Sequence, residues 1–341
     1  MSRVILSVTL TISAFFGAIF ADVSLAKNAS PAPYLQREGV TTYIAELIRE
    51  HGFSRAELEE VFAAAEKRQD IIDLISRPAE RRLNWQEYSA IFLDEQRIAG
   101  GVEFWRQNEA TLERAEQEYG VPPEVIVAII GVETRYGKVT GGHRVVDALM
   151  TLGFDYPPRS RFFRKELTQF LLLAREEGKN PLSLKGSYAG AMGFGQFIPS
   201  SYRSYAVDFD NDGVRDIWQN RVDAIGSVAN YFKRHGWDGR AEVAVPVTVK
   251  AESQQLLDLA NDSLKPTHSV AEMAQMGVVV GELEPDAQVL LLRLAGGAQP
   301  EYWLGFDDFY VITRYNHSRL YAMAVYQLGQ AIIQRYNKTV G

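Results

Sequence analysis

Residues 121–137 of this chain read VPPEVIVAIIGVETRYG, and this stretch decides the fold of the central part. Its apolar residues recur at the spacing of a helix, which places Ile126, Ile129 and Ile130 on one face. The two adjacent prolines suit the first turn of such a helix, and the final glycine suits its end. A lone carboxylate, that of Glu133, finishes the hydrophobic face.

The position of Glu133 predicts a carboxyl group that is hard to ionise. An apolar wall disfavours the charged form, and the C-terminal end of a helix dipole favours cations over anions. Both effects raise the pKa, and an acid that stays protonated near neutral pH is what cleavage of a glycosidic bond needs. The alternative is a surface Glu beside Arg135 and Lys138, because perturbed acids also occur in structural roles.

The composition is that of an ordinary globular protein. The 341 residues are enough for one large domain or two to three small ones, and 46% of them are hydrophobic and 23% charged. A net charge of -7 without any Lys/Arg run argues against nucleic-acid binding, although a local basic groove could hold an anionic polymer. The chain has no cysteine, which excludes disulfides and a lipid anchor on an N-terminal cysteine.

The N-terminus has the pattern of a secretory signal peptide. Arg3 precedes an apolar run, and small residues at Ser24-Leu25-Ala26 suit cleavage after Ala26. An uncleaved membrane anchor is the alternative, but the run is borderline in length and contains Ser, Thr and Gly. We expect residues 1–26 to be removed and the mature protein to be periplasmic.

Helical patterns dominate the chain after a polar leader. Residues 27–118 are expected to form this leader and a helical domain, and residues 119–239 a second block that begins with the Glu133 helix and contains the acidic loop. The expected helices, besides the one that carries Glu133, are Val40–His51, Ser54–Ala65, Ile71–Ile75, the long stretch Trp85–Tyr119, Arg161–Glu177, Pro199–Ala206, Val222–His235 and Ser318–Tyr336.

After Gly239 the hydrophobic period changes from that of a helix to two. Alternating valines from Val243 to Val249, and the segments Val289–Leu294 and Tyr302–Thr313, are typical of strands. Pro246 predicts an edge strand. We therefore expect a small β domain over residues 240–312, followed by a C-terminal helix within 313–341 that returns to the rest of the fold.

A glycine-rich segment, LKGSYAGAMGFGQFIPSS at residues 184–201, permits close backbone approach and unusual dihedral angles. It lacks the Lys-Ser/Thr ending of a phosphate-binding loop and no strand precedes it, so nucleotide binding is not expected. The sequence gives no sign of an organic cofactor.

The segment DFDNDG at residues 208–213 has the opening ligand spacing of an EF-hand calcium loop between two expected helices. Position twelve departs from the pattern, because Gln219 stands where a bidentate Glu is needed, and Asp223 could replace it from an enlarged loop. A solvated acidic turn, or a helix cap at Asp223, is the alternative. The expected ligands of a structural Ca²⁺ are Asp208, Asp210, Asp212, Val214 through its carbonyl, and Asp223.

Together these segments resemble the membrane-bound lytic murein transglycosylase B family, including its soluble relatives. The motifs that carry the resemblance, in chain order, are GVETRYG at 131–137, GAMGFGQF at 190–197, the loop at 208–213, DAIGSVANYF at 223–232 and YNHS at 315–318. The resemblance covers nearly the whole mature chain. It implies an α+β, mainly α fold, in which a helical domain and a small β insert surround a lysozyme-like catalytic core.

The resemblance also implies a reaction. Family members cleave the MurNAc–GlcNAc β-1,4 bond of peptidoglycan without water and leave a 1,6-anhydro-MurNAc end. Glu133 matches the catalytic Glu, which acts first as general acid and then as base. The implied partner is the glycan strand, and protein partners would be sought among those that synthesise or remodel the cell wall.

The resemblance assigns substrate contacts by motif position. Ser187 and Gln196 correspond to sugar and N-acetyl contacts, and Tyr315 and Asn316 lie beside the acid. Turn stabilisation and core hydrogen bonding are the structural alternatives for these side chains. The segment YPPR at 156–159 departs from the family's Tyr-Pro-Arg-Arg, which leaves Arg159 as the one basic contact.

Two rival functions fit the same residues. A hydrolytic muramidase would use water and a second carboxylate, for which Asp147 and Asp155 are near enough in sequence, although Asp147 also suits a helix cap. A non-catalytic, calcium-stabilised wall-binding protein would have no use for Glu133. The product end distinguishes a muramidase, which leaves a reducing MurNAc, from a transglycosylase, which leaves an anhydro sugar.

Overall fold

A computed structural model describes residues 34–76, 83–239 and 242–340 of the chain. The predicted signal peptide, residues 1–26, and the leader as far as residue 33 lie outside the described residues. The described chain divides into two compact units. We call residues 83–136 and 225–340 the first unit, and residues 34–76 and 137–224 the second unit.

The first unit contains the helix predicted from residues 121–137. This helix, α7 (Pro123–Thr134), is buried along nearly its whole length, which explains why it is apolar on all sides. It packs against α5 (Glu95–Gln107) and α15 (Arg319–Val340). The approach of α15 is close enough that a Cβ added to Gly329 would lie 3.0 Å from the carbonyl oxygen of Glu124.

Most of the expected helices are present, with one correction. The stretch Trp85–Tyr119 forms three helices, α4 (Trp85–Phe92), α5 and α6 (Glu109–Tyr119). The first break comes at Asp94, whose side chain caps α5 by accepting a hydrogen bond from the backbone N–H of Arg97. Periodicity alone does not reveal such breaks, because apolar residues recur at roughly helical spacing through the whole stretch.

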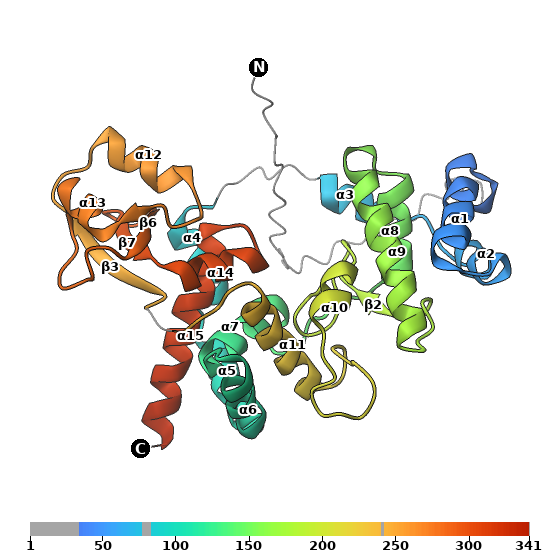
Figure 1. Ribbon diagram of the computed structural model, residues 1–341, viewed down its shortest axis with the longest axis horizontal. Helices are drawn as coiled ribbons and strands as arrows, with labels where there is room; N and C mark the ends of the chain where they lie inside the picture. The colour runs from blue at the N-terminus through green and yellow to red at the C-terminus, as the bar shows by residue number, and fades with distance from the viewer. Residues whose placement is uncertain (1–33, 77–82, 240–241, 341) are drawn as a thin grey trace. The chain divides into compact units, whose positions relative to one another are not determined.

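The small sheet also belongs to the first unit. Within the described residues its five strands are antiparallel and follow the order β4-β6-β7-β3-β5. The strands are β3 (Ala244–Val249), β4 (His268–Ser269), β5 (Val278–Val279), β6 (Gln288–Leu294) and β7 (Glu301–Gly305). Helices α12 (Gln254–Asp262) and α13 (Val270–Gln275) lie beside the sheet (Figure 1), and residues such as Leu256, Met273 and Leu291 form the shared core.

Strand β3 is not the edge strand that Pro246 predicted, because it lies between β7 and β5 in the sheet. β3 pairs with β7 from Ala244 to Val247, but it pairs with β5 only at Thr248 and Val249. Among the described strands, Pro246 therefore has a neighbour on one side only, which suits a residue that has no N–H to donate.

The expectation of a strand over Tyr302–Thr313 is wrong in its second half. The strand ends at Gly305, and α14 (Asp307–Tyr315) follows. Two acidic residues in the first turn of α14 favour a helix start, and one of them, Asp308, accepts hydrogen bonds from the backbone N–H groups of Asp238 and Gly239.

The second unit is mainly helical, and α8 and α9 pack side by side in it (Figure 1). Its helices are α1 (Glu38–His51), α2 (Arg55–Ala63), α3 (Gln69–Ser76), α8 (Val145–Phe154), α9 (Ser160–Glu176) and α10 (Pro199–Tyr205), with short 3-10 turns at Tyr34–Gln36 and Pro157–Arg159. Strands β1 (His143–Arg144) and β2 (Lys185–Gly186) form a two-stranded pair. Helix α11 (Arg221–Arg234) begins in this unit, and its residues from 225 onward belong to the first.

The two compact units thus differ from the domains predicted from the sequence, since each unit is built from two separated segments of the described chain. Those boundaries, at 118/119, 239/240 and 312/313, stay a prediction. None of the helices in the described part of the chain combines the length and apolar character that crossing a membrane requires.

Candidate active site

Glu133 lies in the last turn of α7, in the first unit. Its Oε1 accepts a hydrogen bond of 2.5 Å from the hydroxyl of Tyr321, which comes from α15. Tyr321 is 3% exposed, whereas Glu133 is only partly buried. The acid therefore has a fixed hydrogen-bond donor on its inner side and keeps some access for a substrate.

Burial raises the pKa of Glu133 to about 7, and the hydrogen bond from Tyr321 opposes this rise. The two effects have opposite signs because burial disfavours the carboxylate, while a donated hydrogen bond favours it. The raised pKa predicted from the sequence is confirmed, with burial as its main cause. Near neutral pH both protonation states of Glu133 are populated.

Three tyrosines surround this carboxyl group. Burial is the main cause that raises the pKa values of Tyr315, Tyr321 and Tyr88, and the negative charge of Glu133 adds to the rise in each. Tyr315 was predicted to lie beside the acid, and its ring stacks on Phe232 of α11. Sequence reasoning missed Tyr321 and Tyr88, because nothing in the sequence distinguishes them from core tyrosines.

The chain leaves α7 through a strained turn. Arg135 (φ 51°) and Tyr136 (φ 62°) both adopt the left-handed conformation, which costs energy for residues other than glycine. The helix therefore ends at Thr134, three residues before the glycine expected to stop it. The hydroxyl of Tyr136 donates to the carbonyl oxygen of Arg97 at 2.7 Å.

Arg97 and Gly131 complete the support of this turn. The Arg97 guanidinium is buried and donates to the Gly131 carbonyl oxygen at 2.5 Å, near the C-terminal end of α7. A Cβ on Gly131 would lie 2.6 Å from the hydroxyl oxygen of Tyr136. A buried cation at this end also complements the helix dipole. These contacts fix the turn that follows Glu133.

The glycine-rich segment folds into a compact loop in the second unit. Ser187 Oγ accepts a hydrogen bond from the backbone N–H of Ala191, so this hydroxyl stabilises the turn. Gln196 has φ 50°, and its Nε2 donates to the carbonyl oxygens of Thr140 and Gly193 at 3.1 and 3.0 Å. These bonds hold the Gln196 amide in one orientation and leave its oxygen as an acceptor.

Arg159 lies at the start of α9 in the same unit. Its guanidinium lies 4.4 Å from the ring centre of Phe162, and its Nη1 is buried without a hydrogen-bond partner among the described residues. Burial lowers the pKa of this guanidinium. A buried donor without a partner is costly, which suits a side chain that binds a ligand oxygen.

The predicted site residues are thus divided between the two units. The first unit holds Glu133 and Tyr315, which interact electrostatically, with Asn316 next to Tyr315 at the end of α14. In the second unit, Ser187 and Gln196 share the glycine-rich loop, and Arg159 lies on a different element.

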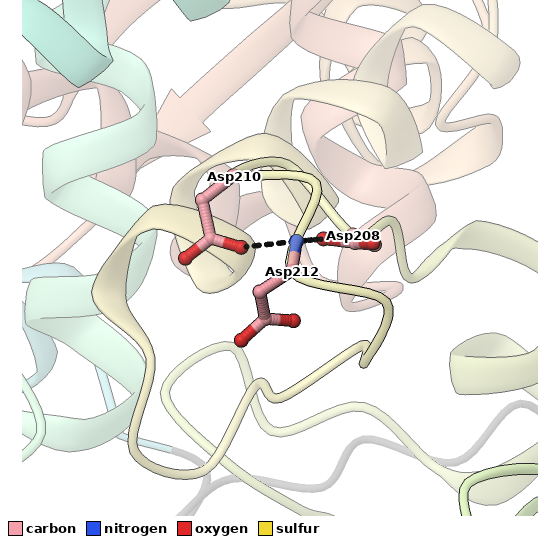
Figure 2. A group of neighbouring side chains, drawn as sticks. All are labelled: Asp208, Asp210 and Asp212. Carbon is pink, nitrogen blue, oxygen red and sulfur yellow. Dashed lines mark hydrogen bonds between the residues drawn. The ribbon is translucent and has the colours of Figure 1, made fainter.

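Three carboxylates of the acidic loop lie close together, and their role as calcium ligands stays a prediction. Figure 2 shows Asp208, Asp210 and Asp212. One carboxylate oxygen from each lies within 4.8 Å of the other two. The backbone N–H of Asp212 donates to Asp208 at 3.1 Å and to Asp210 at 3.3 Å. The loop lies between α10 and α11, and Gly213 has φ 93° at its sharp turn. Three carboxylates are hard oxygen donors that fit Ca²⁺.

Asp223 and Val214 are not part of this carboxylate group. Asp223 is fully buried, and its two oxygens accept hydrogen bonds of 2.7 Å from the backbone N–H groups of Phe209 and Asp216. The Val214 N–H donates to Asp212 Oδ1. Asp223 thus ties the two ends of the loop to the first turn of α11. The ligand roles expected for Asp223 and for the Val214 carbonyl stay predictions.

The two carboxylates considered as a second catalytic group have structural partners in the second unit. Asp147, which is 1% exposed, pairs with Arg144 at 2.6 Å and accepts a hydrogen bond from the backbone N–H of Glu66. Asp155 accepts hydrogen bonds from the side chains of Tyr34 and Arg37 at 3.0 Å. Both acids brace the helices around them.

Comparisons with known proteins agree on one family. The model of the transglycosylase SLT domain matches residues 36–330. The chain is 47% identical over 300 residues to membrane-bound lytic murein transglycosylase B of Escherichia coli (strain K12), which covers 85% of this chain and 81% of that protein.

Solved structures agree with this match. Soluble lytic transglycosylase SltB1 from Pseudomonas aeruginosa is 50% identical with a TM-score of 0.84, covering 88% of this chain and 99% of that one. Escherichia coli lytic transglycosylase Slt35 in complex with calcium is 44% identical with a TM-score of 0.79, covering 89% and 95%. Pseudomonas aeruginosa SltB3 in complex with NAG-anhNAM-pentapeptide is 29% identical with a TM-score of 0.78, covering 89% and 80%.

These likenesses confirm the expected fold class, a mostly helical, lysozyme-like fold with a small sheet. The chain belongs to the transglycosylase SLT domain family, and it is a lytic transglycosylase that acts on murein.

Proposed function

We propose that this protein cleaves the MurNAc–GlcNAc β-1,4 bond of peptidoglycan without water and leaves 1,6-anhydro-MurNAc ends, with Glu133 as the acid and base. The observation that carries the proposal is the carboxyl group of Glu133, whose pKa burial raises to about 7 while Tyr321 holds it at 2.5 Å. Such a group gives up a proton and takes one back at the same pH.

The reaction balances with this one carboxyl group. Protonated Glu133 gives its proton to the glycosidic oxygen, and the bond between that oxygen and C1 of MurNAc breaks. The C6 hydroxyl of MurNAc then attacks C1, and the Glu133 carboxylate takes the hydroxyl proton. The proton returns to its starting point and no water is consumed, so the products together have the mass of the substrate.

Two observations support this route over hydrolysis. Hydrolases that use two carboxylates need them about 5–10 Å apart. Among the described residues, the causes that shift the pKa of Glu133 are burial and Tyr321, with no carboxylate among them, and Asp147 and Asp155 are engaged in structural bonds within the second unit. In addition, the SltB3 complex contains NAG-anhNAM-pentapeptide, an anhydro-sugar ligand.

The substrate contacts follow from the chemistry of the side chains. The oriented amide of Gln196 suits an N-acetyl group, and Arg159 suits a carboxylate. Tyr315 and Asn316 are proposed to contact the sugar next to the acid. Ser187 is proposed to act mainly through the turn that its hydroxyl stabilises.

Calcium is proposed as a structural ion only. Asp208, Asp210 and Asp212 would hold it, and its charge would pin the loop ahead of α11. The Slt35 structure in complex with calcium supports this assignment. We place the mature protein in the periplasm, where its murein substrate lies, after removal of residues 1–26.

Mass spectrometry of purified peptidoglycan digested by native protein and by Glu133→Gln tests the proposal. We expect anhydro-muropeptides from the native protein, and a loss of at least about a thousandfold in rate for the variant. Products with one added water would overturn the anhydro product and identify a muramidase. Turnover that survives in Glu133→Gln would overturn the role of this residue.

A further inference from the structure

A groove with charged walls runs between α1 and α9 of the second unit, with a volume of about 690 Å³. Its α9 wall carries Arg161, Arg164 and Lys165, and its α1 wall carries Glu38 and Glu46. Walls of opposite charge suit a ligand that carries both carboxylates and an amino group.

Among the described residues, none of the three cations on α9 forms an ion pair. Other cations of the same unit do so, since Arg203 pairs with Glu176 and Arg215 with Glu177. The groove therefore offers unsatisfied cations, in a unit where basic side chains usually find carboxylates.

The place of these cations in α9 is also unfavourable for the isolated helix. The N-terminal end of a helix favours anions. The first turn of α9 nevertheless contains no acidic residue, and it contains Arg161, with Arg164 and Lys165 in the next turn. Bound carboxylates would relieve this repulsion by interacting with both the cations and the dipole.

The floor of the groove is held rigidly. Tyr43 of α1 is 5% exposed, its hydroxyl donates to the backbone carbonyl oxygen of Arg164 at 3.1 Å, and it lies 2.8 Å from Thr168 Oγ1. Its ring stacks on Phe62 and meets Phe154 edge-on. Because α1 and α9 are tied together below the charged walls, little ordering is needed when a ligand binds.

We propose that this groove binds the stem peptide of peptidoglycan, with carboxylates against α9 and the free amino group of its diamino acid against α1. The proposal rests on the proposed function, because it names which strands the enzyme prefers. The stem peptide carries several carboxylates and one free amino group, so its charges are complementary to those of the two walls. A bare glycan strand offers the groove no such charges.

Kinetics on two substrates test the groove. The two substrates are glycan strands with intact stem peptides and the same strands after an amidase has removed the peptides. Each is digested by native protein and by Arg161→Ala/Lys165→Ala, a variant that changes two exposed side chains. We expect the variant to raise KM for peptide-bearing strands about fivefold relative to bare strands, with kcat unchanged. Arg49→Ala/Arg55→Ala removes the same charge elsewhere in this unit and should not change the ratio.

Each other outcome is decisive. A ratio of KM values that stays at the native value, or that changes as much in the control, overturns the proposal. The proposal is also overturned if the variant keeps the native KM for peptide-bearing strands but loses binding to phosphatidylglycerol vesicles. The groove would then be a membrane-binding site. Titration of peptide-bearing fragments into Glu133→Gln protein measures binding to the groove without turnover. The proposed reaction and the proposed peptide binding can therefore be refuted separately.

Discussion

The hydroxyl of Tyr321 donates a hydrogen bond of 2.5 Å to Oε1 of Glu133, across 188 residues of sequence. Burial pushes the pKa of this carboxyl group up, and Tyr321 pulls it back to about 7. The acid therefore remains protonated in part of the population near neutral pH and still has a stable conjugate base. A group that acts first as acid and then as base needs both states.

Replacement of Tyr321 by Phe should change the pH dependence of the reaction. The variant removes the donor that favours the carboxylate, so the pKa of Glu133 rises above about 7 and the basic limb of the kcat/KM profile moves to higher pH. We expect kcat at pH 7 to fall about tenfold, since a hydrogen bond to a charged group is lost. A pH series of initial rates measures both effects.

Tyr326→Phe is the matched control for this substitution. Tyr326 lies on the same helix, and its hydroxyl donates to the carbonyl oxygen of Ala244 at 2.9 Å instead of to the acid. We expect its basic limb to coincide with that of native protein. A limb that moves equally in both variants, or in neither, would contradict the role assigned to Tyr321.

The raised pKa of Glu133 also predicts how stability changes with pH. In the unfolded chain this group titrates near 4.5, and in the folded protein at about 7. The folded state therefore binds more protons between these values, and stability falls as the pH rises through them. The cost is absent below pH 4.5 and complete above pH 7, where it is on the order of 3 kcal/mol.

Urea unfolding of native protein and Glu133→Gln at pH 5 and pH 8 checks this prediction. Gln cannot ionise, so we expect the variant to gain free energy of unfolding relative to native protein at pH 8, by up to about 3 kcal/mol, and much less at pH 5. Far-UV spectra confirm that both proteins are folded at each pH. Equal differences at the two pH values would show that Glu133 is not held against ionisation.

Gly131→Ala should destabilise the turn that follows Glu133. Its new Cβ would lie 2.6 Å from the hydroxyl oxygen of Tyr136, which cannot move without losing its bond to Arg97. We expect a loss of about 2–3 kcal/mol in the free energy of unfolding, measured with urea. Gly39→Ala in α1 meets nothing within 4 Å and should be neutral or slightly stabilising. A neutral Gly131→Ala would mean that the turn is not tightly packed.

Calcium should stabilise the protein through its acidic loop. We expect CaCl₂ to raise the melting temperature of native protein, by the equivalent of about 2.7 kcal/mol when calcium is at a hundred times its Kd. Asp208→Asn/Asp212→Asn should lose this response, because it removes two of the three converging carboxylates. MgCl₂ should act more weakly, since Mg²⁺ demands stricter octahedral geometry. If calcium leaves the melting temperature of native protein unchanged, the proposed calcium site is wrong.

Asp223→Ala separates bracing from ligation. Both of its oxygens accept backbone N–H groups, so we expect a loss of about 2–4 kcal/mol in the free energy of unfolding without calcium. The increase in melting temperature caused by calcium should persist, measured by the same thermal scans. If the response to calcium disappears while stability without calcium is unchanged, Asp223 is a ligand after all.

Much of the fold was predictable because helices are encoded locally. The apolar period of residues 121–137 predicted α7 to within a few residues, and the valines from Val243 predicted β3. The expectations that were wrong also rested on local sequence patterns. Residues 302–313 contain apolar side chains at spacings that fit both a strand and a helix, and contacts of Asp308 with distant backbone decide for the helix.

The sequence by itself determined which residues are available for chemistry: one acid at the end of an apolar helix, three alternating aspartates with a glycine, and no cysteine. Tertiary structure decided what those residues experience. Tyr321 and Tyr88 reach Glu133 only because separate helices pack around α7, and Asp223 braces the loop because its side chain points back at the loop backbone. The reason is physical: periodicity reports local conformation, whereas burial, hydrogen bonds and pKa shifts depend on residues that folding brings from far away in the chain.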